Sequence, residues 1–289
     1  MHAKLREWLA DPVDVSARMV FALFLLSTWV TTDDWTFKLP LRVIAIAALV
    51  LPPLHRDPRL WAALAAVMVV KTLRHWFTQD NHIFLLTWFA VGMALSLRST
   101  DPARAACRNA RRLIGLSFLF AALWKGPLSG EFMNGSYFTY TFLTDFRFHG
   151  TARLFAGVPE EALQDNYAAA YQLGGGTADA VVLHGLSPRL HVVALVAAWW
   201  TFAIESALAI VFLAPETWRR LHRARHALLL LFGATTYLVV DIETYGWSLM
   251  ALGAAQSEPE RPGLRALYLA TGLLILAYDY MPLLNWLVG

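Results

Sequence analysis

Cysteine and charge are the two features that this 289-residue sequence has least of. Its single cysteine, Cys107, excludes intrachain disulfides, cysteine-based zinc sites and iron–sulfur clusters. Charged residues make up 16%, against about 25% in typical soluble domains, and hydrophobic residues make up 57%, against about 45–50%. The composition therefore argues against an ordinary soluble domain and against a disordered chain, and it predicts a multi-pass membrane protein.

Net positive charge is also small. The 24 basic and 21 acidic residues leave a charge of +3, scattered along the chain, which argues against a nucleic-acid partner. Lysine is rarer still, because it occurs only at Lys4, Lys38, Lys71 and Lys125, whereas arginine is abundant. This bias fits a GC-rich bacterial genome, and it makes each lysine worth separate attention.

Long uncharged apolar runs are missing as well, since none reaches the roughly 18 residues that usually mark a transmembrane helix. If interfacial and single interior charges are tolerated, eight candidate spans remain. We therefore expect an all-α integral membrane bundle of about eight transmembrane helices, built as one domain over residues 1–289 without a soluble C-terminal domain. The candidate spans are residues 18–32, 39–54, 59–75, 82–98, 111–125, 190–214, 226–244 and 264–286.

The basic residues lie in short connections, and this sets the expected orientation because cytoplasmic loops carry an excess of Lys and Arg. In the eight-span scheme all basic connections and both termini lie on one side, which makes that side the cytoplasmic face of a bacterial inner membrane. Residues 1–17 are expected to form a retained interfacial helix, since no small-residue cleavage site follows a short apolar core. The residues that mark this side are Lys4, Arg6, Arg56, Arg59, Arg98, Arg104, Arg108, Arg111, Arg112, Arg219, Arg220, Arg223 and Arg225.

The opposite side is expected to carry residues 31–38, 74–81, 257–263 and, above all, the long segment 126–189. This segment is rich in aromatic residues and contains three consecutive glycines at 174–176. Its composition predicts external amphipathic or re-entrant helical pieces, and loops of this length are often functional lids. No Lys-Ser/Thr pair follows the glycines, so a phosphate-binding loop is rejected.

An ionisable side chain inside a membrane segment is costly and therefore marks a candidate functional site. Lys125 ends the fifth predicted span, roughly 20 Å from Arg111 at about 1.5 Å per residue. Partial desolvation at that depth favours the neutral amine, which can act as a base. The alternative is a lysine whose charged end reaches the outer interface while its stem packs in lipid.

Asn81 and His82 open the fourth predicted span, directly after Asp80, which can cap the helix. The helix dipole disfavours a charged imidazole at this position, so His82 can serve as a neutral hydrogen-bonding group, although the charge of Asp80 opposes this effect. The alternative is an interfacial histidine bonded to water. In the eight-span scheme His82 and Lys125 reach the same depth in the outer leaflet, beside the aromatic segment.

Glu205 lies in the middle of the sixth predicted span, where it must be protonated, paired or directed into a polar cavity. A structural ion pair or a helix-to-helix hydrogen bond explains it as well as chemistry does. Asp241 and Glu243, flanked by Tyr237 and Tyr245, raise the same question for the seventh span.

Aromatic residues offer two interpretations. Trp124 and the cluster from Tyr137 to Phe148 can line an apolar quinone slot, but aromatic residues at an interface more often form a membrane belt. We favour the belt for most of them.

Other chemistries lack their sequence patterns. The histidine pairs His75/His82 and His184/His191 are seven residues apart, without the ligand spacing or the histidine boxes that a membrane di-iron site needs, so no metal is expected. Serine hydrolase chemistry lacks its Gly-x-Ser-x-Gly elbow. A transporter would show two similar halves with broken helices, and no such repeat is found.

At these same positions the sequence resembles the vitamin K-dependent γ-carboxylase family and the related bacterial membrane-domain proteins of the HTTM group. The likeness covers roughly residues 15–256 and is carried by short motifs. These are Asn81-His82 followed by apolar residues 83–85, Phe-Ala-Ala-Leu-Trp-Lys at 120–125 leading to Gly135, Glu205 within 200–219, and Arg225-His226.

The resemblance implies an enzyme that oxygenates reduced vitamin K or a menaquinone-type quinol, with O₂ and CO₂ as co-substrates. Lys125 would be the base, and His82 and Asn81 would hold the quinone oxygens. The product epoxide and the strong base formed with it would drive proton abstraction and carboxylation of a peptide or small substrate at the outer face.

The sequence also departs from the carboxylases. Gly126-Pro127 follows Lys125, and the large luminal portion that binds the propeptide has no counterpart after the last span. A different peptide substrate is therefore expected, as in relatives similar to a toxin maturation factor. Two other hypotheses stay open, namely a non-catalytic maturation factor that binds lipid or peptide, and a transporter.

Overall fold

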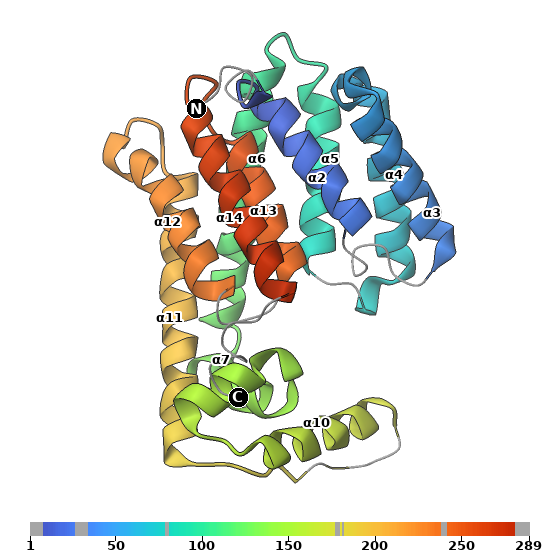
Figure 1. The fold of residues 1–289 in the computed structure, drawn as a ribbon. Coiled ribbons are helices and arrows are strands. Elements are labelled where there is room, and N and C mark those ends of the chain that lie inside the picture. Colours follow the sequence, from blue (N-terminus) through green and yellow to red (C-terminus); the bar gives the residue numbers. More distant parts are fainter. Residues whose placement is uncertain are drawn as a thin grey trace.

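The computed structural model describes residues 8–26, 34–78, 81–176, 180, 182–237 and 242–280. Within these ranges all regular secondary structure is helical and no strand occurs, which confirms the all-α prediction. The helices form two layers, an upright bundle and a smaller set that lies across one end of it (Figure 1).

The bundle holds the long helices, which run up and down beside one another (Figure 1). They are α2 (Pro12–Leu26), α3 (Trp35–Val50), α4 (Pro58–Arg74), α5 (Asn81–Ser96), α6 (Pro102–Lys125), α11 (Pro188–Leu213), α12 (Arg219–Tyr237), α13 (Glu243–Ala255) and α14 (Pro262–Tyr280).

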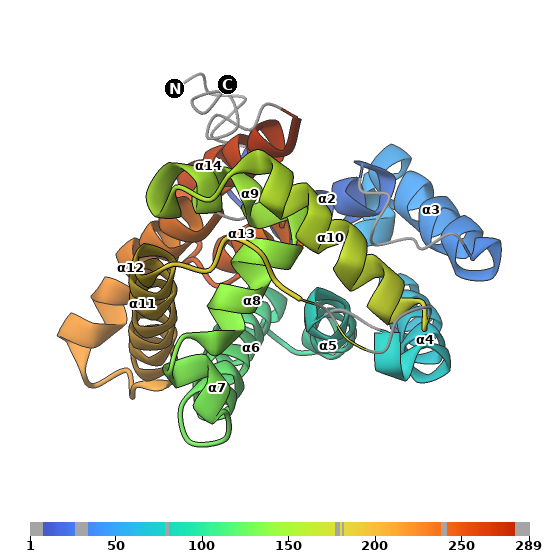
Figure 2. The same ribbon diagram turned by 90° about the horizontal axis from the view of Figure 1, so that it is seen from below.

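The second layer is formed by the predicted external segment, which is helical as expected. Figure 2 shows α10 lying crosswise under the bundle, with α11 seen end-on beside it. The members of this layer are α7 (Gly130–Met133), α8 (Ser136–Thr144), η3 (Phe146–Phe148), α9 (His149–Thr151), the π turn η4 (Ala152–Ala156) and α10 (Glu160–Gly174).

Three bundle helices begin with the same local signal. Asp57, Asp101 and Ser187 each precede a proline, and each side chain accepts a hydrogen bond from a backbone N–H in the first turn of α4, α6 or α11. The proline fixes the first helical residue without losing a needed donor, and the cap satisfies one of the free N–H groups at the helix start. The sequence therefore fixes where the two helices of the candidate site, α6 and α11, begin.

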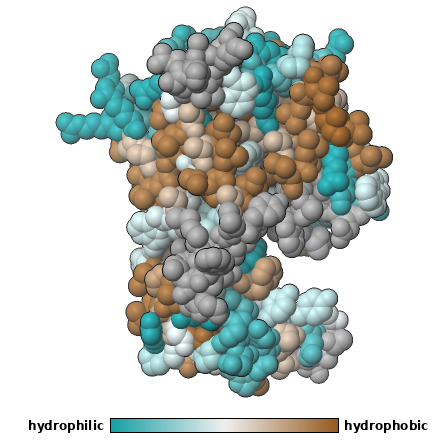
Figure 3. All heavy atoms as spheres, in the orientation of Figure 1, coloured by the Kyte–Doolittle hydropathy of each residue, from teal (hydrophilic) through white to brown (hydrophobic). Residues whose placement is uncertain are grey.

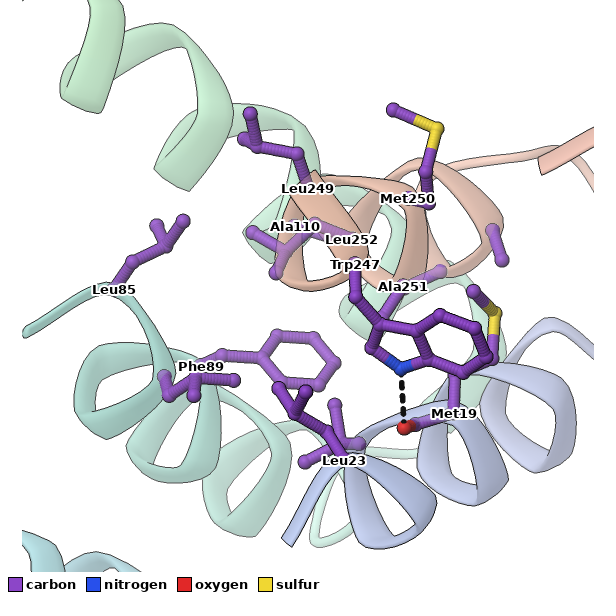
Figure 4. Close-up of a cluster of buried hydrophobic side chains, with 14 of the residues drawn as sticks. Met19, Leu23, Leu85, Phe89, Ala110, Trp247, Leu249, Met250, Ala251 and Leu252 are labelled. Atoms are coloured by element: carbon purple, nitrogen blue, oxygen red, sulfur yellow. Dashed lines mark hydrogen bonds between the residues drawn. The ribbon is translucent and has the colours of Figure 1, made fainter. Parts of the chain in front are cut away.

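The centre of the bundle is an apolar core around α13. Trp247 is buried there, and its indole N–H donates to the backbone carbonyl of Met19 at 2.7 Å (Figure 4). Phe89 and Leu252 complete this cluster from α5 and α13. The core thus ties α13 to α2, at the other end of the chain.

The boundaries predicted for the seventh span, 226–244, are wrong. Helix α12 ends at Tyr237, and residues 243–255, which were not expected to form a helix, make up α13. This helix is short and rich in small residues, which hides it from a search for apolar spans. Gly253 in this helix is needed for packing, because a Cβ at this position would lie 2.5 Å from the ring of Tyr268 on α14.

The turn 257–263 lies at the same end of the bundle as the start of α2, whereas the eight-span scheme put it at the opposite end. The guanidinium of Arg265 is buried and donates to the carbonyls of Leu9 and Ala10, so that α14 and α2 begin at the same end of the bundle. We call this end, which includes η1 (Pro52–Arg56), the basic end. α2 and α14 leave it in the same direction (Figure 1). The two termini lie in residues 1–7 and 281–289, outside the described residues, so the side on which each terminus lies stays a prediction.

Of the segment 1–17, predicted to form an interfacial helix, residues 1–7 lie outside the described residues, so that helix stays a prediction. Residues 12–17 form the start of α2, and Val15 and Ala17 are fully buried. The acidic side chain of this segment, Asp14, is paired within the fold, 3.0 Å from the imidazole of His55 and 2.7 Å from Nε of Arg56. Burial of this segment is possible because its charge is compensated.

Among the described residues, α11 is the one helix that is both long and apolar enough to span a membrane. α5 and residues 262–278 of α14 are apolar but shorter. A helix of 16 residues such as α3 or α5 reaches about 24 Å, which is less than the roughly 30 Å of a bilayer core.

Candidate functional site

A large cleft separates the bundle from the second layer, and it holds the candidate site. Its volume is about 2070 Å³, and side chains from α5, α6, α8, α10, α11 and α12 line it. The space-filling view shows this hollow between the upper and lower parts of the molecule (Figure 3). Most of the lining is aromatic or aliphatic, so the few polar groups in it stand out.

Lys125 is the last residue of α6, and Glu205 lies on α11 beside it. The Nζ of Lys125 is 2.5 Å from Oε1 of Glu205, and the two side chains are 20% and 8% exposed. Helices α6 and α11 approach closely at this level, because a Cβ on Gly126 would lie 2.6 Å from the ring of Phe202. The ammonium group also lies over the ring of Phe132, 5.4 Å from its centre.

Lys125 therefore has a carboxylate partner at hydrogen-bonding distance in the wall of the cleft. For Glu205, which could be paired or catalytic, the structure shows an ion pair across two helices, at the wall of the cleft. Any proton that leaves Lys125 has an acceptor within reach in Glu205.

The second carboxylate oxygen of Glu205, Oε2, is buried and accepts no hydrogen bond from any residue that the structure describes. The hydroxyl of Tyr237 is buried and unpartnered in the same way. Tyr237 and Tyr245 are both close enough to Glu205 to interact with it electrostatically, and Tyr245 hydrogen-bonds the Ser117 side chain. All of these side chains line the cleft.

His82 reaches the same cleft from the start of α5. Its side chain is 5% exposed, whereas the neighbouring Asn81 is exposed, and both line the cleft. Asp80, the expected cap, lies outside the described residues. His82, Asn81, Lys125 and Glu205 therefore all line one large cleft, in which Lys125 and Glu205 are in direct contact.

The aromatic residues divide into two groups. Trp124 is 63% exposed at the rim, and Tyr137, Tyr140 and Phe146 line the cleft with about half of their surface exposed. The other aromatic residues of the cluster, Phe138, Phe142 and Phe148, are buried in a core of their own, so the membrane belt stays a prediction for the exposed ones only. This second core contains Phe132, Phe138, Phe142 and Phe148, together with Leu163 of α10 and Leu190 of α11.

The sequence analysis did not identify Tyr237 and Tyr245 as residues of the candidate site. Tyr237 and Tyr245 were named only as neighbours of Asp241 and Glu243, but it is the tyrosines whose side chains lie at the cleft. Asp241 lies outside the described residues, and so does the side chain of Glu243.

Among the described residues, no group of three His, Cys, Asp or Glu side chains is placed to hold a metal ion. His75 packs edge-on against Phe37, with ring centres 5.9 Å apart, and the backbone of His184 bonds Asn166. Cys107 donates to the carbonyl of Gln256 near the basic end.

The chain matches no protein-family model, no curated protein and no solved structure. The chemistry of the cleft is therefore argued from its own residues.

Proposed function

We propose that the chain is a multi-pass protein of a bacterial inner membrane, with the basic end in the cytoplasm. The support is a stripe of apolar residues that points outward on α3. Leu39, Val43, Ile46 and Val50 recur at helical spacing, and each is more than half exposed. An outward apolar stripe is unfavourable in water and favourable in lipid. Figure 3 shows apolar side chains over the sides of the bundle and polar ones over its basic end.

Within that membrane we propose a carboxylase-like enzyme that oxygenates a reduced quinone in the cleft. The observation that carries this proposal is the buried Lys125–Glu205 pair in the wall of a large apolar cleft that also contains His82. A charged pair is expensive to keep in such a place, and perturbed ionisable groups in clefts mark functional sites. The proposed substrate is reduced vitamin K or a menaquinone-type quinol, with O₂ and CO₂ as co-substrates.

The residues of the cleft fit such a ligand. Aromatic and aliphatic walls suit a fused ring and its prenyl tail, and Asn81, His82 and Lys125 offer polar groups for two ring oxygens. When bound, the quinol supplies the reducing power, so that quinol and O₂ give quinone epoxide and water. Lys125 and Glu205 would hold and pass the proton that the quinol loses, since one short hydrogen bond joins them.

The acceptor that such chemistry would modify is a peptide or a small molecule at the outer face. The cleft is much larger than a quinone ring requires, and the exposed tyrosines Tyr140, Tyr167 and Tyr171 of the second layer line its far wall. This leaves room for a second substrate beside the first. Proton abstraction followed by addition of CO₂ is the reaction proposed for it.

The test is epoxide formation by the purified protein in lipid nanodiscs, supplied with reduced menaquinone or vitamin K and oxygen. We expect epoxide from wild type and at least about 100-fold less from His82→Phe and from Lys125→Met/Glu205→Leu, because a general acid–base pair contributes about 10²–10⁴-fold. Lys38→Met and His184→Phe are matched controls, since neither residue lines the cleft. No epoxide from wild type with either quinol would overturn the proposal.

One observation favours a second candidate, a non-catalytic maturation factor that holds a lipid or peptide. Lys125 is already paired with Glu205, so the cleft has charge and hydrogen-bonding capacity without a free base. Such a protein would bind quinol or peptide and leave it unchanged. A transporter would instead move solute across sealed vesicles, which a flux measurement detects.

A further inference from the structure

Glu205 has hydrogen-bonding capacity that the fold leaves unused. Oε1 is engaged by Lys125, but Oε2 accepts nothing from the described residues although the side chain is only 8% exposed. A buried carboxylate oxygen without a donor is costly, because the group has lost its water and gained nothing in return. An oxygen left in this state at the wall of a cleft is a candidate ligand contact.

The surroundings restrict what can satisfy this oxygen. Among the described residues the buried hydroxyl of Tyr237 also has no partner, and that of Tyr245 hydrogen-bonds Ser117. A ligand group placed here must therefore offer a donor to Glu205, and it can accept from or donate to Tyr237. A ligand oxygen that only accepts, such as a quinone carbonyl or an ether, would meet the negative carboxylate without a proton between them.

We infer that Glu205 Oε2 is the receptor for a hydroxyl group on an aromatic ring, and that this contact makes the cleft select the reduced, hydroxyl-bearing form of its ligand over the oxidised form. The aromatic lining supplies the ring contacts, from Phe132 beside Lys125 to Trp200 on α11. The inference rests on the proposed function only in taking a quinol as the natural ligand. It assigns Glu205 a role in specificity that the pairing with Lys125 alone does not give it.

The test uses two redox-stable probes of nearly equal shape, 2-methyl-1-naphthol and its methyl ether. Only the naphthol can donate a hydrogen bond. Binding is measured by equilibrium dialysis against the protein in nanodiscs, with empty nanodiscs as the partition blank. We expect wild type to bind the naphthol at least about tenfold more tightly than the ether, since a hydrogen bond to a buried charge is worth roughly that much or more.

Glu205→Gln should abolish the preference, because the charge is lost and an amide N–H can itself donate to the ether. Glu216→Gln is the matched control, since Glu216 pairs with Arg111 outside the cleft, and it should keep the full preference. If Glu205→Gln does not fold, the wild-type ratio decides by itself. Equal affinity of wild type for the two probes, binding of neither probe, or an unchanged preference in a folded Glu205→Gln protein would each overturn the inference.

The outcomes separate this inference from the proposed enzyme. A naphthol preference that needs Glu205, with no epoxide from any quinol, leaves the binding role standing and removes the oxygenase. Epoxide formation without any naphthol preference would support the oxygenase and remove the binding role of Glu205. Oε2 would then be satisfied by a hydrogen bond from water.

Discussion

Lys125 and Glu205, eighty residues apart in the sequence, meet at 2.5 Å across the contact between α6 and α11. The contact places a compensated charge pair in the apolar wall of the cleft. Its position depends on the close approach of the two helices at Gly126, where any side chain would strike Phe202. The pair is therefore a property of helix packing, and its energetics can be tested directly.

Removing one partner of the pair should be much worse than removing both. Lys125→Met leaves a buried carboxylate unpaired, and we expect it to lower the free energy of unfolding by about 3–5 kcal/mol. Lys125→Met/Glu205→Leu should recover most of this loss, because two apolar side chains need no compensation. Denaturation in mixed detergent micelles measures both. A double variant no more stable than Lys125→Met would contradict the compensated-pair account.

Close packing of α13 against α14 gives a second prediction, which has an internal control. Gly253→Ala places a methyl group 2.5 Å from the buried Tyr268 ring, and we expect it to destabilise the protein by about 1–3 kcal/mol. Gly263→Ala, with no other atom within 4 Å of the new Cβ, should change stability far less. Thermal denaturation measures the melting temperatures of the two variants. Equal losses would show that α13 does not pack against α14 as described.

The hydrogen bond between Trp247 and Met19 ties the two ends of the chain together. Trp247→Phe keeps an aromatic ring but removes the donor to the Met19 carbonyl, and we expect a loss of about 1–3 kcal/mol. Trp218→Phe, at an exposed tryptophan, is the control and should have little effect. If chemical denaturation finds the two variants alike, α13 does not anchor α2.

We expect the stability of the protein to fall in acid because of Asp14, which lies at the basic end. Burial raises the pKa of Asp14, but hydrogen bonds from His55 and Arg56 outweigh burial and hold this pKa well below its usual range. A carboxyl with a lowered pKa in the folded state stabilises the protein above its unfolded pKa, about 3.9 for aspartate, and this contribution is lost as the pH falls further. Wild type should therefore lose melting temperature below about pH 4.

Asp14→Asn should lower the melting temperature at neutral pH and flatten its decline below about pH 4. Asp165→Asn, at an exposed position on α10, should leave the wild-type profile unchanged. Parallel profiles for wild type and Asp14→Asn through the acid range would show that another group controls the acid response.

Much of the bundle could be predicted because helix starts and apolar stretches are local signals. The Asp-Pro and Ser-Pro pairs mark the starts of α4, α6 and α11. The predicted spans begin within about two residues of the starts of α4 and α11, but the span for α6 was begun at residue 111, well inside the helix that starts at Pro102. α13 could not be found in this way. Its residues are buried by neighbours from both ends of the chain, such as Met19 and Tyr268, and only the tertiary structure reveals this.

The candidate site shows the same limit. The sequence singled out Lys125, His82 and Glu205 one by one, because an ionisable side chain in an apolar segment is energetically costly and therefore unusual. This holds wherever its partner lies. Which of them pair depends on how α5, α6 and α11 are arranged, and that is not encoded in any local spacing. The aromatic segment shows the same limit, since only the tertiary structure reveals that Phe138 and Phe142 are buried in a second core.

The most direct measurement of the central claim supplies ¹⁸O₂ to the wild-type protein with reduced menaquinone and follows the product by mass spectrometry. Oxygenation in the cleft predicts a quinone epoxide that carries one ¹⁸O atom, with the second atom of O₂ leaving as water. The Lys125→Met/Glu205→Leu variant should form no detectable labelled epoxide. An unlabelled epoxide, or no epoxide at all from wild type, would contradict the account of the cleft as a site of quinol oxygenation.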